Sequence, residues 1–415
     1  MIFTKVCIIG AGPGGAAAAL NLNKAGIDCV VVDKAVFPRD KICGDGLSGK
    51  VITSLKRIDP EIGVRLEHAG FKLNSWGVRF VAPGRRQLDI GYRPDFDQNN
   101  AAHKQVPIGY VCKRFDFDNF LVEELKRCPR IQLFEGVNIN KYVLENDGYL
   151  VSGSDGFAVK AQLVIVANGA YSSFTKEVAG IHMEPKHYVA GIRAYYKNVT
   201  GTNADNFIEL HFLKSLLPGY FWIFPLPDGG ANVGVGMLSE AVRRKKINLK
   251  KELLNIVQND PVIKERFKDA QLEGTIDGYG LPLGSKKRKI SGERYMLIGD
   301  AAYLIDPFTG EGIGNAFYSG RLAAQQAALS LQNNDFSATA MARYDAEIER
   351  VMGAELRLSH KLQKFIKYPI LFDTFLKITA NNKRLKEVFT CMFHEVDIRK
   401  KLLRPSFYLD ILLNR

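Results

Sequence analysis

A short glycine-rich turn between two apolar runs constrains the fold of this chain more than any other part of its sequence. Val6–Ile9 and Cys29–Asp33 are rich in β-branched residues, and the alanine-rich segment Gly14–Ala25 lies between them. Such runs predict two buried strands joined by a helix. Parallel strands need a crossover of this kind, so we expect the chain to begin with a βαβ unit.

Gly10, Gly12 and Gly15 give the turn a GxGxxG spacing. In a βαβ unit the first glycine permits the tight turn, the second lets the backbone approach a pyrophosphate, and the third lets helix and strand pack closely. Glycine-rich turns also serve ordinary packing, but Asp33 ends the second strand, where a carboxylate can bind a ribose hydroxyl. We therefore predict dinucleotide binding by Gly10, Gly12, Pro13, Gly14, Gly15, Asp33 and Lys34.

The chain is long and apolar enough to bury a full core. Its 415 residues are 46% hydrophobic, which is compatible with two or three domains. It has no uninterrupted apolar run of about 18 residues, and glycines break the N-terminal apolar stretch, so we expect neither a membrane-spanning helix nor a signal peptide. The six cysteines lack CxxC spacing, which predicts reduced thiols and no metal site. These features favour a cytoplasmic protein.

The net charge of +13 is concentrated at the C-terminal end. Residues 351–415 contain 13 Lys and Arg against 6 Asp and Glu, and Lys361–Arg404 mixes basic and apolar residues at helical spacing. Helices of this kind can lie on an anionic membrane surface, which would make the protein peripheral at the inner face of a membrane. The more common alternative is a solvated helix packed on its own domain. No nucleic-acid-binding motif accompanies the charge, so we expect no nucleic-acid partner.

The hydrophobic pattern changes twice along the chain. Alternating β runs within Tyr188–Leu238 predict a separate sheet, and Ser239–Gln258 has the spacing of one basic amphipathic helix. Tyr295–Ile298 predicts another buried strand, and residues 321–415 are expected to be almost wholly helical. Because no flexible linker separates these parts, we expect interleaved domains.

A second glycine-rich segment follows the strand at Tyr295–Ile298. It reads GDAAYLIDPFTGEGIG from Gly299 to Gly314 and resembles the GD motif of aromatic-hydroxylase-type flavoproteins. The resemblance implies FAD, with Asp300 on the ribityl hydroxyls and the following loop beside the isoalloxazine ring. A helix starting at about Gly314 would aim its positive end at the ring. The contacts implied here are Gly299, Asp300, Pro307, Gly310, Gly312 and Ile313.

Two shorter segments resemble the same superfamily. Arg114, before a predicted helix at Phe115–Arg127, matches an arginine used against the cofactor, although it could equally form a surface ion pair. Residues 167–170 match an ADGxxS segment with Asn168 where Asp is usual, which implies that Gly169 lies at the cofactor.

Two further motifs resemble the geranylgeranyl reductase family. Phe37–Leu47 reads FPRDKICGDGL, similar to a PRxKxCGD segment, and Tyr220–Pro225 reads YFWIFP, similar to YxWxFP. The resemblance covers residues 1 to about 330 and places Arg39, Cys43 and Gly44 at the flavin. It implies FAD-dependent reduction of isolated carbon–carbon double bonds in polyprenyl groups, with NADPH or NADH as a transient electron donor and an apolar lipid as substrate.

Catalytic roles are expected in the CGD triplet. Cys43 is a candidate proton donor or gate, and a small buried thiol is the alternative. Gly44 is expected to let the backbone approach the flavin, and Asp45 to orient water or stabilise the loop. Tyr220, Trp222 and Phe224 alternate along a predicted strand and therefore share one face, which could line a prenyl tunnel or belong to the core.

We therefore expect an α/β fold in which a Rossmann-type FAD-binding domain is interleaved with a β-sheet substrate domain and followed by a helical region. The expected ranges are 1–70, 106–180 and 275–340 for the first, 71–105 and 181–274 for the second, and 341–415 for the third. A flavin-dependent monooxygenase or halogenase is the alternative function, because halogenases carry a WxWxIP segment similar in layout to FWIFP. A lipid-binding escort protein without redox chemistry is a more distant alternative.

Overall fold

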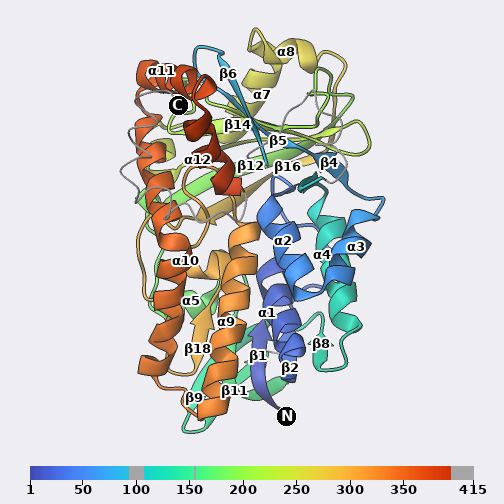
Figure 1. Cartoon of the computed structure of the whole chain (residues 1–415), viewed down its shortest axis with the longest axis vertical. Helices are drawn as coiled ribbons and strands as arrows, with labels where there is room; N and C mark the ends of the chain where they lie inside the picture. Colours follow the sequence, from blue (N-terminus) through green and yellow to red (C-terminus); the bar gives the residue numbers. More distant parts are fainter. Residues whose placement is uncertain (93–106, 154–155, 394–415) are drawn as a thin grey trace.

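The computed structural model describes residues 1–92, 107–153 and 156–393. Two large β-sheets organise the molecule. Figure 1 shows the first in the lower half, behind α1 and α9, and the second across the upper half. The long helix α10 runs along one side beside both parts. The bounds of the helices are α1 Pro13–Lys24, α2 Gly49–Ile58, α3 Pro60–Glu67, α4 Arg114–Lys126, α5 Ser173–Glu177, α6 Ser239–Lys245, α7 Leu249–Asn259, α8 Ile263–Arg266, α9 Ile313–Asn333, α10 Ala338–Phe365, α11 Pro369–Ala380 and α12 Lys383–Phe393.

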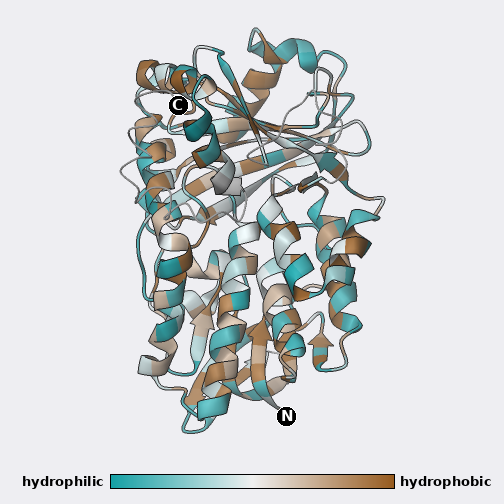
Figure 2. Ribbon diagram, viewed as in Figure 1, coloured by the Kyte–Doolittle hydropathy of each residue, from teal (hydrophilic) through white to brown (hydrophobic). Residues whose placement is uncertain are grey.

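The first sheet has eight strands and a parallel centre in the order β18-β11-β1-β2-β8. Its central residues are buried on both faces, as expected for a parallel sheet covered by helices, and Figure 2 shows apolar colouring along β1. The strands are β1 Ile2–Ile9, β2 Cys29–Val32, β8 Ile131–Phe134, β9 Ile139–Glu145, β10 Gly148–Gly153, β11 Ala158–Val166, β17 Ser291–Gly292 and β18 Tyr295–Leu297.

Helices α1 and α9 cross closely beside this sheet because both present small residues at the crossing. A Cβ added at Gly320 in α9 would lie only 2.5 Å from the carbonyl oxygen of Gly14 in α1. The alanines of α1, Ala16 to Ala19, are fully buried. This close packing brings the start of α9 next to the glycine-rich turn, although the two segments are about 300 residues apart in the sequence.

The second sheet has seven strands in the order β16-β12-β15-β14-β13-β5-β6. All its pairings are antiparallel except that of β13 with β5. Strand β14 alternates, so that Phe221 and Ile223 are fully buried while Tyr220, Trp222 and Phe224 are partly exposed on the other face. The strands are β5 Gly77–Val81, β6 Gln87–Gly91, β12 Tyr188–Lys197, β13 Ile208–His211, β14 Gly219–Pro225, β15 Ala231–Leu238 and β16 Gln271–Pro282; a small third sheet contains β3 Gly46–Leu47, β4 Leu73–Ser75 and β7 Gly109–Val111.

The expected α/β fold with interleaved parts is confirmed, because strands of the two large sheets alternate along the chain. The expectation of one helix over Ser239–Gln258 is wrong. Lys246 adopts a left-handed backbone (φ +53°) that ends α6, and Asn248 then caps α7 by accepting a hydrogen bond from the backbone N–H of Lys251 at 3.1 Å.

Two observations bear on the expected domain ranges. Strand β16 pairs with β12 on both sides of the expected boundary between residues 274 and 275, so this boundary falls within a single strand. Parts of the ranges 71–105 and 341–415 lie outside the described residues. Within residues 1–92, 107–153 and 156–393, none of the helices combines the length and apolar character that crossing a bilayer requires.

Candidate functional site

A cleft of about 400 Å³ lies at the carboxyl edge of the first sheet, where ligands bind in open α/β sheets. We call it the nucleotide cleft. Residues from widely separated segments line it, and among them are Gly10, Gly12, Pro13, Gly14, Asp33, Lys34, Arg39, Arg114, Asn168, Gly169, Gly299 and Asp300. The structure thus brings together most of the residues predicted to contact the cofactor.

The three glycines of the turn differ in what surrounds them. Gly10 has a φ of +110°, and a Cβ there would lie 2.5 Å from the carbonyl oxygen of Ala167. Gly15 does not line the cleft, and its Cβ would lie 1.8 Å from the carbonyl oxygen of Gly10. In the described structure a Cβ at Gly12 would meet only Nη2 of Arg39, at 3.9 Å. Gly12 therefore keeps space open on the cleft side.

Asp33 fixes the turn as well as lining the cleft. Its carboxylate accepts hydrogen bonds from the backbone N–H groups of Ala11 at 2.7 Å and Ala35 at 2.8 Å. These bonds hold the acid at the end of β2 with oxygen lone pairs remaining for a hydroxyl donor.

Asn168 is a further sign that the cleft fits a hydroxyl-rich cofactor. Its Oδ1 is buried and, within the described part of the chain, accepts no hydrogen bond. A buried acceptor without a partner is costly, and a ribose or ribityl hydroxyl would satisfy it. Together with the open space above Gly12, this shows that the residues present fit FAD.

Arg114 and Arg39 are held in the cleft by the carboxylate of Asp118, a residue that no sequence motif indicated. Asp118 is fully buried, accepts two hydrogen bonds of 2.6 Å from Arg114, and pairs with Arg39 at 2.5 Å. Burial alone would raise the pKa of Asp118, but the guanidinium of Arg114 outweighs it, with help from Arg39, and holds that pKa below its usual value. The i, i+4 spacing of Arg114 and Asp118 on a predicted helix is the signal that could have revealed it.

Asp300 lies where the nucleotide cleft meets a second, apolar cavity. Its carboxylate pairs with Lys41 at 3.1 Å, a residue that sequence reasoning did not single out. Helix α9 begins at Ile313, one residue before the predicted start, and Gly312 precedes it. The positive end of the helix dipole therefore lies beside Asp300, as expected for a site that holds an electron-rich group.

Two inner cavities of about 130 and 110 Å³ lie next to each other behind the cleft. They share part of their walls: Cys43, Gly44, Trp222, Leu281, Gly310, Gly312 and Ile313. Phe224 lines the smaller one, while Tyr220 and Trp222 also line a third, narrower space of about 50 Å³ that includes Pro307. The predicted face of β14 thus lines cavities, and Pro307 lies away from the nucleotide cleft.

The CGD triplet is anchored to the second sheet through Asp45. This residue is fully buried with a φ of +68°, and its Oδ2 accepts hydrogen bonds from Tyr195 at 2.7 Å and Asn232 at 2.8 Å. Asn232 also donates to the carbonyl oxygen of Cys43 at 2.7 Å and accepts from Trp222 Nε1 at 2.9 Å. These contacts hold the loop against the aromatic strand.

Burial shapes the chemistry of the same triplet. It raises the pKa of Asp45 to about 6, with the hydrogen bonds from Asn232 and Tyr195 opposing the rise, and it raises the pKa of the Cys43 thiol. Cys43 is therefore an uncharged thiol at neutral pH.

Gly44 leaves room for an aromatic ring of the second sheet. A Cβ at Gly44 would lie 2.9 Å from the ring of Phe224, so a glycine is needed here for that ring to pack.

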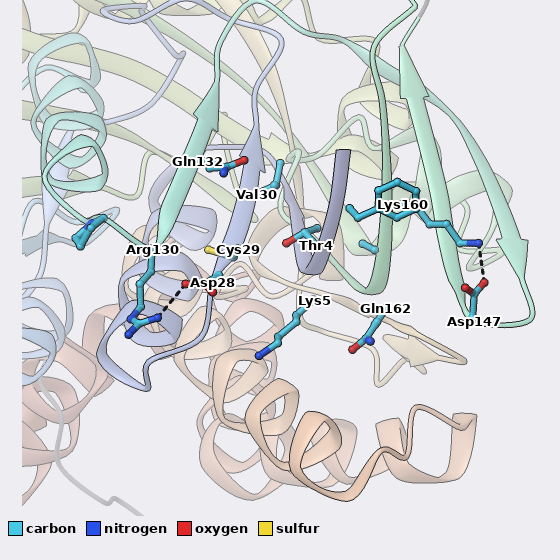
Figure 3. Close-up of a pocket in the computed structure, with 13 residues that line it drawn as sticks. Thr4, Lys5, Asp28, Cys29, Val30, Arg130, Gln132, Asp147, Lys160 and Gln162 are labelled. Atoms are coloured by element: carbon cyan, nitrogen blue, oxygen red, sulfur yellow. Dashed lines mark hydrogen bonds and ion pairs between the residues drawn. The ribbon is translucent and has the colours of Figure 1, made fainter. Parts of the chain in front are cut away.

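Another cavity, of about 570 Å³, opens at the opposite, amino edge of the first sheet (Figure 3). Its charged walls are largely paired, with Arg130 on Asp28 at 3.0 Å and Lys160 on Asp147 at 2.8 Å. None of the predicted site residues lies there, and the sheet topology places ligands at the other edge. We assign it no function.

The sequence of this chain is similar to those of known proteins. A model of the family described as FAD binding domain matches residues 3–352. A menaquinone reductase of Mycolicibacterium smegmatis is 31% identical over 77% of this chain and 75% of its own length. A digeranylgeranylglycerophospholipid reductase of Thermoplasma volcanium is 29% identical over 82% of each chain.

Solved structures resemble this one in fold. A geranylgeranyl bacteriochlorophyll reductase-like protein from Thermoplasma acidophilum has a TM-score of 0.79 at 23% identity, covering 96% of this chain and 98% of its own. A flavin-dependent brominase has a TM-score of 0.75 at 18% identity, covering 94% and 93%. At these identities the likeness shows the fold alone, so neither structure decides between a reductase and a halogenase.

Proposed function

We propose that this chain, which belongs to the FAD binding domain family, acts as a geranylgeranyl reductase and saturates carbon–carbon double bonds of an isoprenoid lipid. It is an FAD-dependent oxidoreductase. The observation that carries the proposal is the pair of inner cavities, which share walls of Trp222, Leu281 and Ile313. The larger of the two adjoins the nucleotide cleft at Asp300. An apolar chain that enters them would lie next to the flavin.

The residues of the chain have separable tasks in this reaction. FAD, when bound, supplies the hydride. Asp33, Asn168 and Asp300 would hold its hydroxyl groups, and Arg39 and Arg114 would complement its phosphates. Trp222 and Phe224 orient the alkene and exclude water, which matters because an isolated double bond offers no carbonyl to polarise.

The electron donor is proposed to be NADPH or NADH, bound transiently. The sequence has no second GxGxxG turn within a βαβ unit, so a dedicated nicotinamide domain is not expected.

Turnover with and without oxygen tests the proposed function. The purified holoprotein, given NADPH or NADH and a polyprenyl lipid under anaerobic conditions, is expected to yield a product that gains two hydrogens per double bond, read by mass spectrometry. An oxygen-dependent gain of an oxygen or a halogen, without any reduction, would instead assign the protein to the monooxygenases or halogenases. Bound lipid without turnover would favour the escort alternative.

Contact with an anionic membrane surface is a second part of the proposal, since the substrate is a lipid. On α11 the exposed fractions of Ile370, Leu371 and Ile378 are 81%, 54% and 51%. The exposed Lys377 lies on the same helix, and the exposed Lys367 lies in the turn that precedes it. Apolar residues with flanking lysines favour the surface of an anionic bilayer.

Vesicle binding measures this contact. Replacing Ile370 and Leu371 together by serine is expected to weaken binding to phosphatidylserine-containing vesicles at least about tenfold, because each side chain contributes about 1.5 kcal/mol or more when buried. Leu329, 47% exposed on α9, provides the matched control as Leu329→Ser. Equal binding by both variants would contradict membrane contact through α11.

A further inference from the structure

A cluster of largely buried ionisable side chains lies behind the inner cavities, and the proposed reaction described above assigns it no role. Lys50 of α2 is 1% exposed and forms an ion pair with Glu355 of α10, whose side chain is 19% exposed. Asp306, which is 1% exposed, and Glu311 come from the loop before α9. The cluster thus joins two helices and the loop that carries the flavin-side glycines, and Glu355 connects it to solvent.

Glu311 extends from this cluster to the substrate side. It lines the smaller inner cavity together with Cys43 and Phe224. Its Oε1 accepts a hydrogen bond of 2.7 Å from the backbone N–H of Gly314, in the first turn of α9. A Cβ at Gly314 would lie 2.9 Å from that oxygen and 3.2 Å from Cδ of Lys50, so the carboxylate and the lysine stem meet over this glycine.

The cluster has three carboxyl groups and one ammonium group, and among the described residues Lys50 is the cation that acts most strongly on Glu311 and Glu355. The Tyr318 ring of α9 lies 5.8 Å from Lys50 Nζ, and Asp306 Oδ1 accepts hydrogen bonds from the backbone N–H groups of Phe308 and Thr309 and from the Thr309 hydroxyl. With every carboxylate ionised the cluster would carry a charge of −2 in a poorly solvated place, which is unfavourable. Retaining one proton relieves the repulsion.

The pKa shifts of the carboxyl groups agree with a cluster that retains one proton. Burial raises the pKa of Glu311, with Lys50 opposing the rise, and burial raises the pKa of Glu355 to about 7, again with Lys50 opposing and Asp306 adding to it. Two carboxyl groups that share one lysine titrate as a pair, so the proton belongs to the cluster rather than to one residue.

We propose that this cluster stores the proton that each reduction consumes, that Glu311 donates it to the substrate carbon, and that Glu355 takes up its replacement from water. The inference rests on the proposed function. In the balanced step the π bond of the alkene breaks, a hydride from the reduced flavin forms one C–H bond, and the proton of the Glu311 carboxyl group forms the other. The carboxylate left on Glu311 regains a proton through Glu355. A carboxylic acid is intrinsically a stronger acid than a thiol, and burial raises the pKa of the Cys43 thiol further, so Glu311 is the better donor.

Glu311→Gln tests the donor role with the structure largely preserved, because the amide oxygen can still accept from Gly314. Lipid reduction is expected to fall about 100-fold, the lower end for loss of a general acid, whereas flavin reduction by NADPH and the FAD content stay as in the wild type. Glu124→Gln, which removes a buried carboxylate that pairs with Arg65 and lines none of the cavities described above, is the control and is expected to retain the wild-type rate. Wild-type lipid reduction by Glu311→Gln would overturn the proposal.

Glu355→Gln tests the uptake of the proton. The wild-type rate is expected to decline above about pH 7, because the cluster must hold its shared proton and burial raises the pKa of Glu355 to about 7. In the variant Lys50 no longer shares its charge with Glu355 and lowers the pKa of Glu311 further, so the decline is expected to begin at a lower pH. An unchanged pH profile would contradict a shared proton.

Infrared spectroscopy of the holoprotein, without substrate, measures the stored proton directly. The wild type is expected to show the carbonyl band of a protonated carboxyl group that titrates near neutral pH. The band is expected to be lost in Glu311→Gln, to titrate at a lower pH in Glu355→Gln and to stay unchanged in Glu124→Gln. A wild type without this band would overturn the proton store even if lipid reduction is observed. Conversely, a band without any lipid reduction would leave the store standing and remove the proposed function.

Discussion

Replacing Gly12 by alanine is expected to abolish tight FAD binding while leaving the apoprotein as stable as the wild type. A methyl group here meets no protein atom closer than 3.9 Å, and Gly12 has a φ of −66°, which alanine adopts without strain. The methyl group would instead occupy the space above the turn that the pyrophosphate must enter. An overpacked contact costs up to about 3 kcal/mol, which corresponds to weaker binding by a factor on the order of 100.

Gly15→Ala is the informative comparison, three residues along the same turn. Its methyl group would lie 1.8 Å from the carbonyl oxygen of Gly10, so the helix and strand must separate. We expect Gly15→Ala to lower both the free energy of unfolding and FAD affinity, and Gly12→Ala to lower FAD affinity alone. Titration with FAD and urea unfolding of the apoproteins measure the two quantities. Equal destabilisation of both apoproteins would show that Gly12 is a packing glycine.

Asp118→Asn is expected to give the largest loss of stability among single substitutions at the site. The carboxylate is fully buried and neutralises Arg114, itself 3% exposed, as well as Arg39. Removing one partner of a buried ion pair leaves an uncompensated charge and costs about 3–5 kcal/mol. FAD affinity should fall as well, because both arginines line the nucleotide cleft. Urea unfolding at pH 7 measures the change in the free energy of unfolding.

The effect of Asp118→Asn should depend on pH in one direction. Because the pKa of Asp118 in the folded protein is below its unfolded value, ionised Asp118 stabilises the fold fully above about pH 4, and this contribution is lost as the pH falls through the folded pKa. The difference between variant and wild type should therefore shrink in acid. Glu123→Gln, which removes an exposed pair with Lys126 on the same helix, should change the free energy of unfolding by less than about 1 kcal/mol. An equal loss for the two variants would contradict a special role for Asp118.

Local sequence patterns predicted the nucleotide cleft well. The glycine turn, the acid and the GD segment follow β1, β2 and β18, which all end at the carboxyl edge of the first sheet, so a correct strand prediction places the residues after it. For Gly10, Asp33 and Asp300 the sequence neighbourhood and the spatial neighbourhood coincide. The family resemblance, confirmed by the comparisons, rests on the same local motifs.

Residues that act through contacts between distant segments were missed for a physical reason. Lys41 meets Asp300 across 259 positions, Asn232 meets Asp45 across 187, and Lys50 meets Glu355 across 305. No periodicity or motif links such pairs, because the motifs that contain Lys41, Asp45 and Asp300 do not indicate which distant side chain each of them meets. Their roles exist only once the two sheets and α10 are packed.

The sequence by itself therefore determined the βαβ opening, the dinucleotide-binding turn and the shared face of Tyr220, Trp222 and Phe224, because these depend on backbone geometry over a few residues. Only the tertiary structure decided what that face lines, how Asp45 anchors the CGD triplet, and that a lysine and three carboxyl groups are buried together behind the cavity. Burial and electrostatic coupling depend on every neighbour in space, and those neighbours come from all parts of the chain.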